Sequence, residues 1–149
     1  RAVRVPANLV PECSRRARAL PVFATLLANG RAGVREMVER HLDLAAHLRS
    51  RIAEADDLEL VDDGELNVVP FRLAPQGVRR RDLDALNADA GRRVLEDGRV
   101  YVGTTRYRSV VCFRPAIANW RTRTADVDLL VDAVRQSGQR ALRDGVPGP

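Results

Sequence analysis

Residues 101–122, YVGTTRYRSVVCFRPAIANWRT, limit the possible folds of this chain more than any other part of the sequence. Two apolar segments, 100–104 and 109–119, flank a short polar stretch, which predicts two paired strands joined by a tight turn. Arg114 stands inside the second predicted strand. Pro115 beside it favours an edge strand or a bulge, because proline has no N–H to donate to a central ladder.

The rest of the chain reads as alternating helices and strand pairs. Apolar residues from Val34 to Ile52 recur at three- and four-residue steps, which predicts a long amphipathic helix. The other predicted elements are a short helix over 16–29 closed by Gly30, strands at 58–61 and 66–73, a helix carrying Leu83 to Val94 that stops at Gly98, and a last helix capped by Thr124. This order predicts an α+β fold, with helices packed on one face of a small, mainly antiparallel sheet.

The composition narrows the classes of function. A chain of 149 residues is long enough for one domain with a hydrophobic core. The net charge is +5, but all 25 basic residues are arginines, spread among 20 acidic ones, so coding bias explains them better than nucleic-acid binding.

No apolar run approaches the ~20 residues of a membrane span, and 1–10 lacks the apolar core of a signal peptide. Cys13 and Cys112 suggest no disulfide framework, so we expect a cytoplasmic protein. Because the first residue is not methionine, we expect a fragment, a processed product or a trimmed form of a longer protein.

Few residues suggest chemistry by themselves. His41 and His47 are six positions apart on one predicted helix and share no face, so no metal site is expected. Arg114 is the exception, because a guanidinium in an apolar strand is costly to bury unless an anion meets it. From physical chemistry alone, an internal salt bridge or an edge-strand charge that deters aggregation is the preferred explanation.

Four segments resemble, in order and spacing, the C-terminal part of group II pyridoxal-phosphate-dependent amino-acid decarboxylases, the family of the aromatic-L-amino-acid and glutamate decarboxylases. The segments are 11–26 (PECSRRARALPVFATL), 30–41 (GRAGVREMVERH), 67–72 (NVVPFR) and 113–122 (FRPAIANWRT). The resemblance runs from about Pro11 to Ser137. It implies a fold-type-I homodimer whose N-terminal and large cofactor domain lie upstream of this chain. Residues 1–30 would then end the large domain and its linker helix, 31–145 would form the small C-terminal domain, and 146–149 would be a disordered tail.

The same resemblance assigns possible roles to individual residues. Arg114 matches the small-domain arginine proposed to hold the carboxylate of the amino-acid substrate, which makes this role preferable to a purely structural one. Cys13 and Ser14 fall where the family approaches the cofactor phosphate of the neighbouring subunit. No catalytic residue is expected in this chain, because the family's cofactor-binding lysine lies upstream and the sequence contains no lysine.

The leading hypothesis is therefore the C-terminal part of a carboxy-lyase, inactive alone, with an aromatic-type L-amino-acid substrate and pyridoxal phosphate bound in the complete enzyme. The alternative is a freestanding, non-catalytic module derived from the small domain that dimerises or regulates a true decarboxylase. The third hypothesis is a basic nucleic-acid-binding domain. It ranks last because the predicted strands of this chain lack a pattern of stacking aromatic residues.

Overall fold

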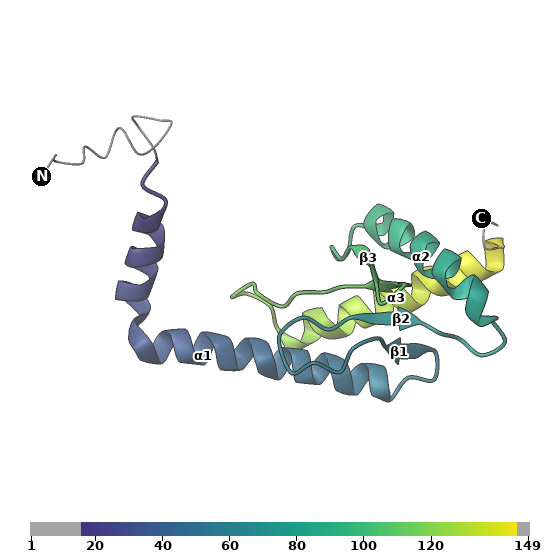
Figure 1. The fold of residues 1–149 in the computed structure, drawn as a ribbon, viewed down its shortest axis with the longest axis horizontal. Helices are drawn as coiled ribbons and strands as arrows, with labels where there is room; N and C mark the ends of the chain where they lie inside the picture. Colours follow the sequence, from purple (N-terminus) through teal and green to yellow (C-terminus); the bar gives the residue numbers. More distant parts are fainter. Residues whose placement is uncertain (1–15, 146–149) are drawn as a thin grey trace, which may run out of the picture. The chain divides into compact units, whose positions relative to one another are not determined.

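A computed structural model describes residues 16–145, and the chain divides between Glu36 and Met37 into two compact units. The elements follow the predicted order (Figure 1), although helix α1 enters both units. Their bounds are α1 Ala19–Ala53, β1 Leu58–Leu60, β2 Phe71–Leu73, the short 3-10 helix η2 Arg80–Asp82, α2 Leu83–Asp97, β3 Thr104–Tyr107, β4 Val110–Phe113 and α3 Thr124–Asp144. None of the helices in this described part is long and apolar enough to cross a membrane.

The first unit contains the beginning of α1. Gly30 has φ 62° and ψ −173°, a conformation that interrupts the helix and that favours glycine. The predicted boundary at Gly30 is therefore a kink rather than an end, because helical geometry resumes immediately after it. Before the kink the helix exposes apolar side chains, among them Leu20, Phe23 and Leu27.

The second unit is built on a four-stranded antiparallel sheet in the order β1-β2-β4-β3. Strands β3 and β4 form the predicted hairpin, and the two residues at its tip, Arg108 and Ser109, both have positive φ. This is the turn geometry that matches the twist of a two-residue hairpin. Because β4 lies inside the sheet, the expectation of an edge strand at Pro115 was wrong. The strand ends at Phe113, two residues before the proline, so the ladder needs no N–H from it.

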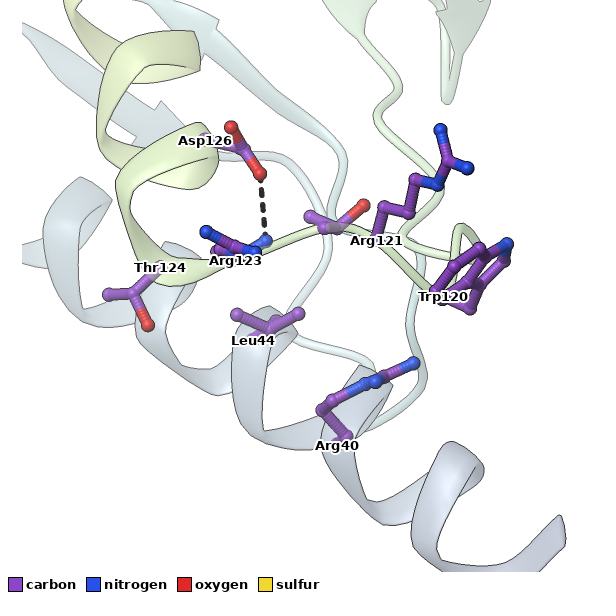
Figure 2. A pocket seen from close by; sticks show the side chains of 8 residues that line it. Arg40, Leu44, Trp120, Arg121, Arg123, Thr124 and Asp126 are labelled. Carbon is purple, nitrogen blue, oxygen red and sulfur yellow. Dashed lines mark hydrogen bonds between the residues drawn. The ribbon is translucent and has the colours of Figure 1, made fainter. Parts of the chain in front are cut away.

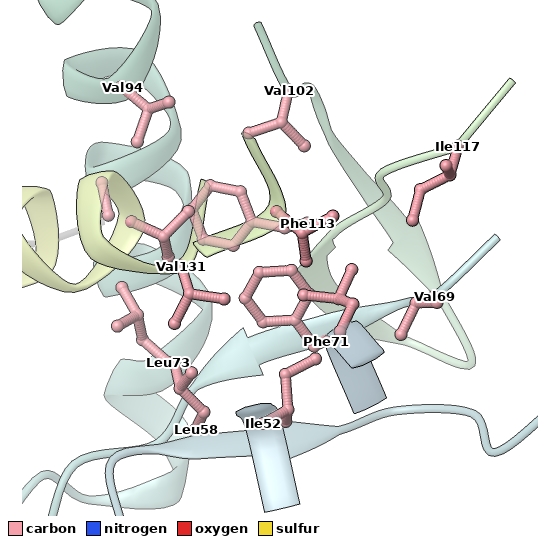
Figure 3. Packing of buried hydrophobic residues seen from close by; sticks show 14 of the residues in the cluster. Ile52, Leu58, Val69, Phe71, Leu73, Val94, Val102, Phe113, Ile117 and Val131 are labelled. Carbon is pink, nitrogen blue, oxygen red and sulfur yellow. The ribbon is translucent and has the colours of Figure 1, made fainter. Parts of the chain in front are cut away.

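The hydrophobic core lies between one face of this sheet and the helices. Phe71 and Phe113 are directly opposite each other on β2 and β4, and their rings stack with centroids 5.6 Å apart. Figure 3 shows Val94 of α2, Val131 of α3 and Ile52 of α1 around this pair, and all three are buried. The sequence-based expectation of a small antiparallel sheet with helices on one face is confirmed.

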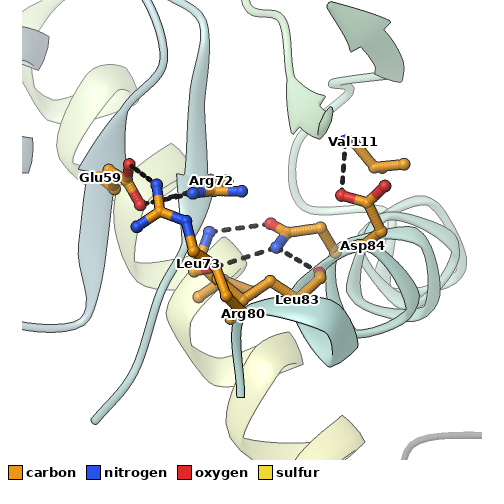
Figure 4. A network of polar contacts seen from close by, with 8 residues as sticks. Glu59, Arg72, Leu73, Arg80, Leu83, Asp84 and Val111 are labelled. Atoms are coloured by element: carbon orange, nitrogen blue, oxygen red, sulfur yellow. Dashed lines mark hydrogen bonds and ion pairs between the residues drawn. The ribbon is translucent and has the colours of Figure 1, made fainter. Parts of the chain in front are cut away.

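Strands β2 and β4 pair at Phe71 and Phe113 and separate from there toward Leu73 and Val110, where side chains of α2 take over the backbone pairing (Figure 4). The amide of Asn87, which is fully buried, accepts the N–H of Leu73 at 2.8 Å and donates to the Leu73 carbonyl at 2.9 Å. The carboxylate of Asp84 accepts the N–H of Val111 at 2.9 Å. Helix α2 is thus fixed to both strands by hydrogen bonds as well as by apolar contact.

The helix ends agree in part with the sequence prediction. Helix α2 stops at Gly98, which has the predicted left-handed conformation with φ 73°. Thr124 is the first residue of α3 rather than its cap, and the capping position belongs to Arg123. The Arg123 N–H donates to the carboxylate of Asp126 at 2.8 Å, so the predicted role of Asp126 in the first turn holds.

Candidate functional site

Arg114 follows directly after β4, and its backbone continues the sheet beyond the regular strand. Its N–H donates to the Gly103 carbonyl at 3.1 Å, and the Val69 N–H donates to the carbonyl of Pro115 at 3.2 Å. An isolated bridge joins Val68 to Ala116. The backbone that carries Arg114 is therefore held from both sides, while its side chain is exposed.

The Arg114 side chain lines a hollow of about 270 Å³. Apolar walls come from the loop between β1 and β2 and from β3, and the hollow is lined by Asp62, Gly64, Leu66, Val68, Pro70, Thr105, Tyr107 and Arg114. On β3, Thr104 lies against Gly91 of α2, and Arg106 bonds Asp84 of α2. Thr105 and Tyr107 alternate with these two residues along the strand. Because side chains alternate between the two faces of a strand, the hollow lies on the face of the sheet opposite α2.

A hydrogen bond between Tyr107 and Asp62 closes one side of the hollow. The Tyr107 hydroxyl donates to the Asp62 carboxylate at 2.6 Å, and the Gly64 N–H donates to the same carboxylate at 3.1 Å. Arg108 at the hairpin tip approaches it at 3.6 Å. The hydrogen bond from Tyr107 and then that from Gly64 lower the pKa of Asp62, which keeps this carboxylate charged.

The loop carrying Asp62 is also anchored from helix α1. Arg49 donates from Nη2 to the carbonyls of Gly64 and Leu66. The loop is thus tied to the hairpin through Tyr107 and to α1 through Arg49. These two ties give the hollow a fixed wall opposite Arg114.

The guanidinium of Arg114 has no carboxylate within 4.0 Å and no hydrogen bond among residues 16–145. It stands beside the apolar side chains of Leu66, Val68 and Pro70, which exclude water from one side of any ion bound there. A guanidinium with free N–H groups at an apolar hollow can hold a carboxylate by two parallel hydrogen bonds.

The other residues considered from sequence do not join this hollow. Cys13 and Ser14 lie outside the described residues. Cys112 is buried in β4, and burial raises the pKa of its thiol, so it is a small packing residue without a thiolate's reactivity. The Nε2–H of His47 donates to the Asp128 carboxylate at 2.9 Å, and His41 is buried. No cluster of metal-ligating side chains occurs in the part of the chain that is described.

A partly buried ion pair on the same face of the sheet was not predicted from the sequence. Arg72 is 3% exposed, and its Nη2 and Nε donate to the Glu59 carboxylate at 2.8 and 3.1 Å. The two residues are cross-strand partners in β1 and β2. Alternation places each of them on the face away from the core, but only the register reveals that they meet. Figure 4 shows Arg80 approaching the same carboxylate.

No family model matches the sequence. The chain is 28% identical over 117 residues to an aromatic-L-amino-acid decarboxylase of Bacillus atrophaeus, an alignment that covers 78% of this chain and 24% of the relative. It is 26% identical over 104 residues to tyrosine decarboxylase 2 of Arabidopsis thaliana, covering 70% of this chain and 19% of the relative.

Solved structures show the same fold. Mouse CSAD in its apo form matches with a TM-score of 0.81 and 24% identity, over 90% of this chain and 30% of that one. Oryza sativa TDC, solved with PLP and tryptamine, matches with a TM-score of 0.79 and 19% identity, over 91% of this chain and 29% of that one. A cysteine desulfurase of Escherichia coli also matches, with a TM-score of 0.64, so the fold extends beyond decarboxylases.

The sequence relatives are group II pyridoxal-phosphate-dependent decarboxylases, which confirms the resemblance found in the motifs. The chain spans about a quarter of the length of these relatives, a share that fits their C-terminal portion. The sequence contains no lysine, the side chain that forms a Schiff base with pyridoxal phosphate.

Proposed function

We propose that this chain is the C-terminal part of a decarboxylase of L-amino acids that uses pyridoxal phosphate, and that Arg114 binds the carboxylate of the substrate. The observation that carries the proposal is the guanidinium of Arg114, which has no ion-pair partner among residues 16–145, beside an apolar hollow on the face of the sheet opposite α2. The sequence relatives support the reaction class, since those with decarboxylase names cover 70 to 80% of this chain.

Arg114 would contribute orientation and charge. Two parallel hydrogen bonds from a guanidinium fix both oxygens of a carboxylate and therefore the direction of the bond that breaks when carbon dioxide leaves. The backbone around Arg114 is held by Gly103 and Val69, so the side chain starts from a fixed position. A fixed donor needs little reorganisation when the substrate binds.

The remaining parts of the proposal rest on the resemblance. Residues 1–30 would end the large domain, 31–145 would form the small domain, and Cys13 and Ser14 would approach the cofactor phosphate of the partner subunit in a cytoplasmic homodimer. The substrate would be an aromatic-type amino acid. The names of the relatives from Bacillus atrophaeus and Arabidopsis thaliana support this substrate class.

The test is a decarboxylation assay on the protein made from the complete reading frame that contains this sequence. We expect release of carbon dioxide from an aromatic L-amino acid, dependence on added pyridoxal phosphate, and much slower release from glutamate. The 149-residue chain alone should release none. If the complete reading frame yields no activity on any L-amino acid, the proposal is wrong, and the alternative of a non-catalytic dimerising or regulatory module takes its place.

A further inference from the structure

A second surface of the larger unit carries positive charge that no carboxylate balances among residues 16–145. A hollow of about 870 Å³ lies where α1 passes the segment leading into α3, and Arg40, Trp120, Arg121 and Arg123 line it. Figure 2 shows Arg40 reaching from α1 toward Trp120. Across the described residues, no carboxylate lies within 4.0 Å of the Arg40, Arg121 or Arg123 guanidinium.

Trp120 makes this basic hollow suited to binding a protein partner. Its side chain is 65% exposed, although tryptophan is costly to leave in water, and the Arg121 guanidinium sits 4.8 Å from the centroid of its ring. The ring holds the guanidinium in place through a cation–π contact and leaves its N–H groups free to bind an anion. Tryptophan and arginine are the residues in which binding energy most often concentrates at protein interfaces.

The basic hollow continues into an apolar one. A second hollow, of about 300 Å³, shares Thr122 and Asp126 with the first. Its walls include Val100, Ile117 and Leu130, and Tyr101 at its edge is 92% exposed. A partner that covers both hollows therefore needs negative charge at one end and an apolar side chain at the other.

We infer that these two hollows together form a docking surface for an acidic protein segment that carries an apolar anchor residue. Its carboxylates would pair with Arg40, Arg121 and Arg123, and its anchor would enter the hollow beside Tyr101. Charge complementarity and an aromatic centre are the usual features of such an interface. A nucleic acid fits less well, because the apolar hollow offers its phosphates nothing. The surface shares no lining residue with the hollow at Arg114.

Trp120 provides a direct test, because it is the only tryptophan in the sequence. The 149-residue chain would be titrated with a short peptide of glutamates around a central leucine, and Trp120 emission would be followed. We expect a saturable change that weakens as salt is added. Arg40→Gln and Arg123→Gln should each weaken binding about fivefold, and Tyr101→Ala should weaken it about fivefold or more. Arg79→Gln and Leu95→Ala, which alter exposed residues outside both hollows, should bind the peptide like the unaltered chain.

Each other outcome overturns the inference. No saturable change at low salt would show that the surface does not bind acidic segments. Equal affinity for a peptide with alanine in place of leucine, together with a harmless Tyr101→Ala, would show that the apolar hollow takes no part. Equal or tighter binding of inorganic pyrophosphate or of an oligothymidylate of the same charge would replace the protein segment with a simple polyanion. Circular dichroism on each variant separates lost binding from lost folding, since the substituted side chains are exposed.

Discussion

Asn87 satisfies three backbone groups with one side-chain amide, and the divergence of β2 from β4 depends on it. It pairs with the N–H and carbonyl of Leu73 and donates to the carbonyl of Leu83 at 2.8 Å. Asn87→Leu keeps the size of the side chain but leaves these buried groups without partners, so we expect a loss of about 3 kcal/mol in the free energy of unfolding. Urea denaturation measures this loss in the free energy of unfolding. Gln139→Leu, at an exposed position of α3, is the control, and equal effects of the two changes would contradict this role of Asn87.

The hydrogen bond between Tyr107 and Asp62 should be visible in the titration of the carboxylate. Removing the hydroxyl in Tyr107→Phe removes the first cause of the lowered pKa, so the pKa of Asp62 should rise toward its ordinary value of about 3.9. Carbon-13 NMR of the Asp62 carboxyl group measures the change. An unaltered pKa would mean that the Gly64 N–H and Arg108 hold the charge without Tyr107.

The hydrogen bond between Tyr107 and Asp62 should also make the free energy of unfolding depend on pH. The folded-state pKa of Asp62 is depressed, so its stabilising contribution is fully present above the unfolded-state pKa and is lost as pH falls through the folded value. The difference in unfolding free energy between the unaltered chain and Tyr107→Phe should therefore be constant from neutral pH to about pH 5 and shrink below about pH 4. Tyr107 has a raised pKa from the same bond, so the difference should shrink again at alkaline pH.

At the scale of secondary-structure elements, Gly138 lets α3 approach β2 closely. A Cβ atom at this position would lie 2.7 Å from Cδ1 of Leu73, which is buried in the core. Gly138→Val must displace that side chain or move the helix, and we expect a loss of about 2 kcal/mol in the free energy of unfolding. Thermal or urea unfolding would show this loss, whereas Gln139→Val, on the exposed side of the same helix, should have little effect. Equal stabilities of the two variants would mean that α3 packs more loosely than the structure indicates.

The helices could be predicted from the sequence because local signals mark them, whereas the strands could be predicted only in part. The periodic apolar residues of α1 and the left-handed Gly98 after α2 are such local signals, and both elements appear as expected. The predicted strand over 109–119 contains only four strand residues, and beyond Phe113 the backbone pairs only through single hydrogen bonds and an isolated bridge. Beside the strand, Asp84 and Asn87 of α2 bond backbone groups of Val111 and Leu73. A helix side chain that replaces a strand partner depends on tertiary contact and leaves no periodic trace in the sequence.

The candidate site was predictable only through the type of one residue. An arginine beside an apolar strand is unusual by itself, so Arg114 stood out in the sequence. The wall opposite it is made by Asp62 and Tyr107, which are 45 positions apart, and by Arg49 from a helix. Nothing in the local sequence of any of these residues indicates that they meet.

At the scale of the whole molecule, the described residues form a four-stranded sheet packed against helices, and the beginning of α1 exposes apolar residues. The sequence contains no lysine. The likeness to a cysteine desulfurase as well as to decarboxylases means that the fold does not determine the reaction. What distinguishes the proposed function is the single guanidinium at the hollow on the open face of the sheet.

Substitution of Arg114 in the complete protein tests this account most directly. With decarboxylation followed at steady state, Arg114→Ala should lower kcat/KM about a hundredfold or more while the visible absorbance of the bound cofactor stays unchanged. Arg114→Lys should recover part of the loss, because it keeps the charge without the planar fork. Arg106→Ala, on the opposite face of the same hairpin, should leave kcat/KM nearly unaltered. Unchanged turnover in Arg114→Ala would contradict the account and leave Arg114 a surface residue of the sheet.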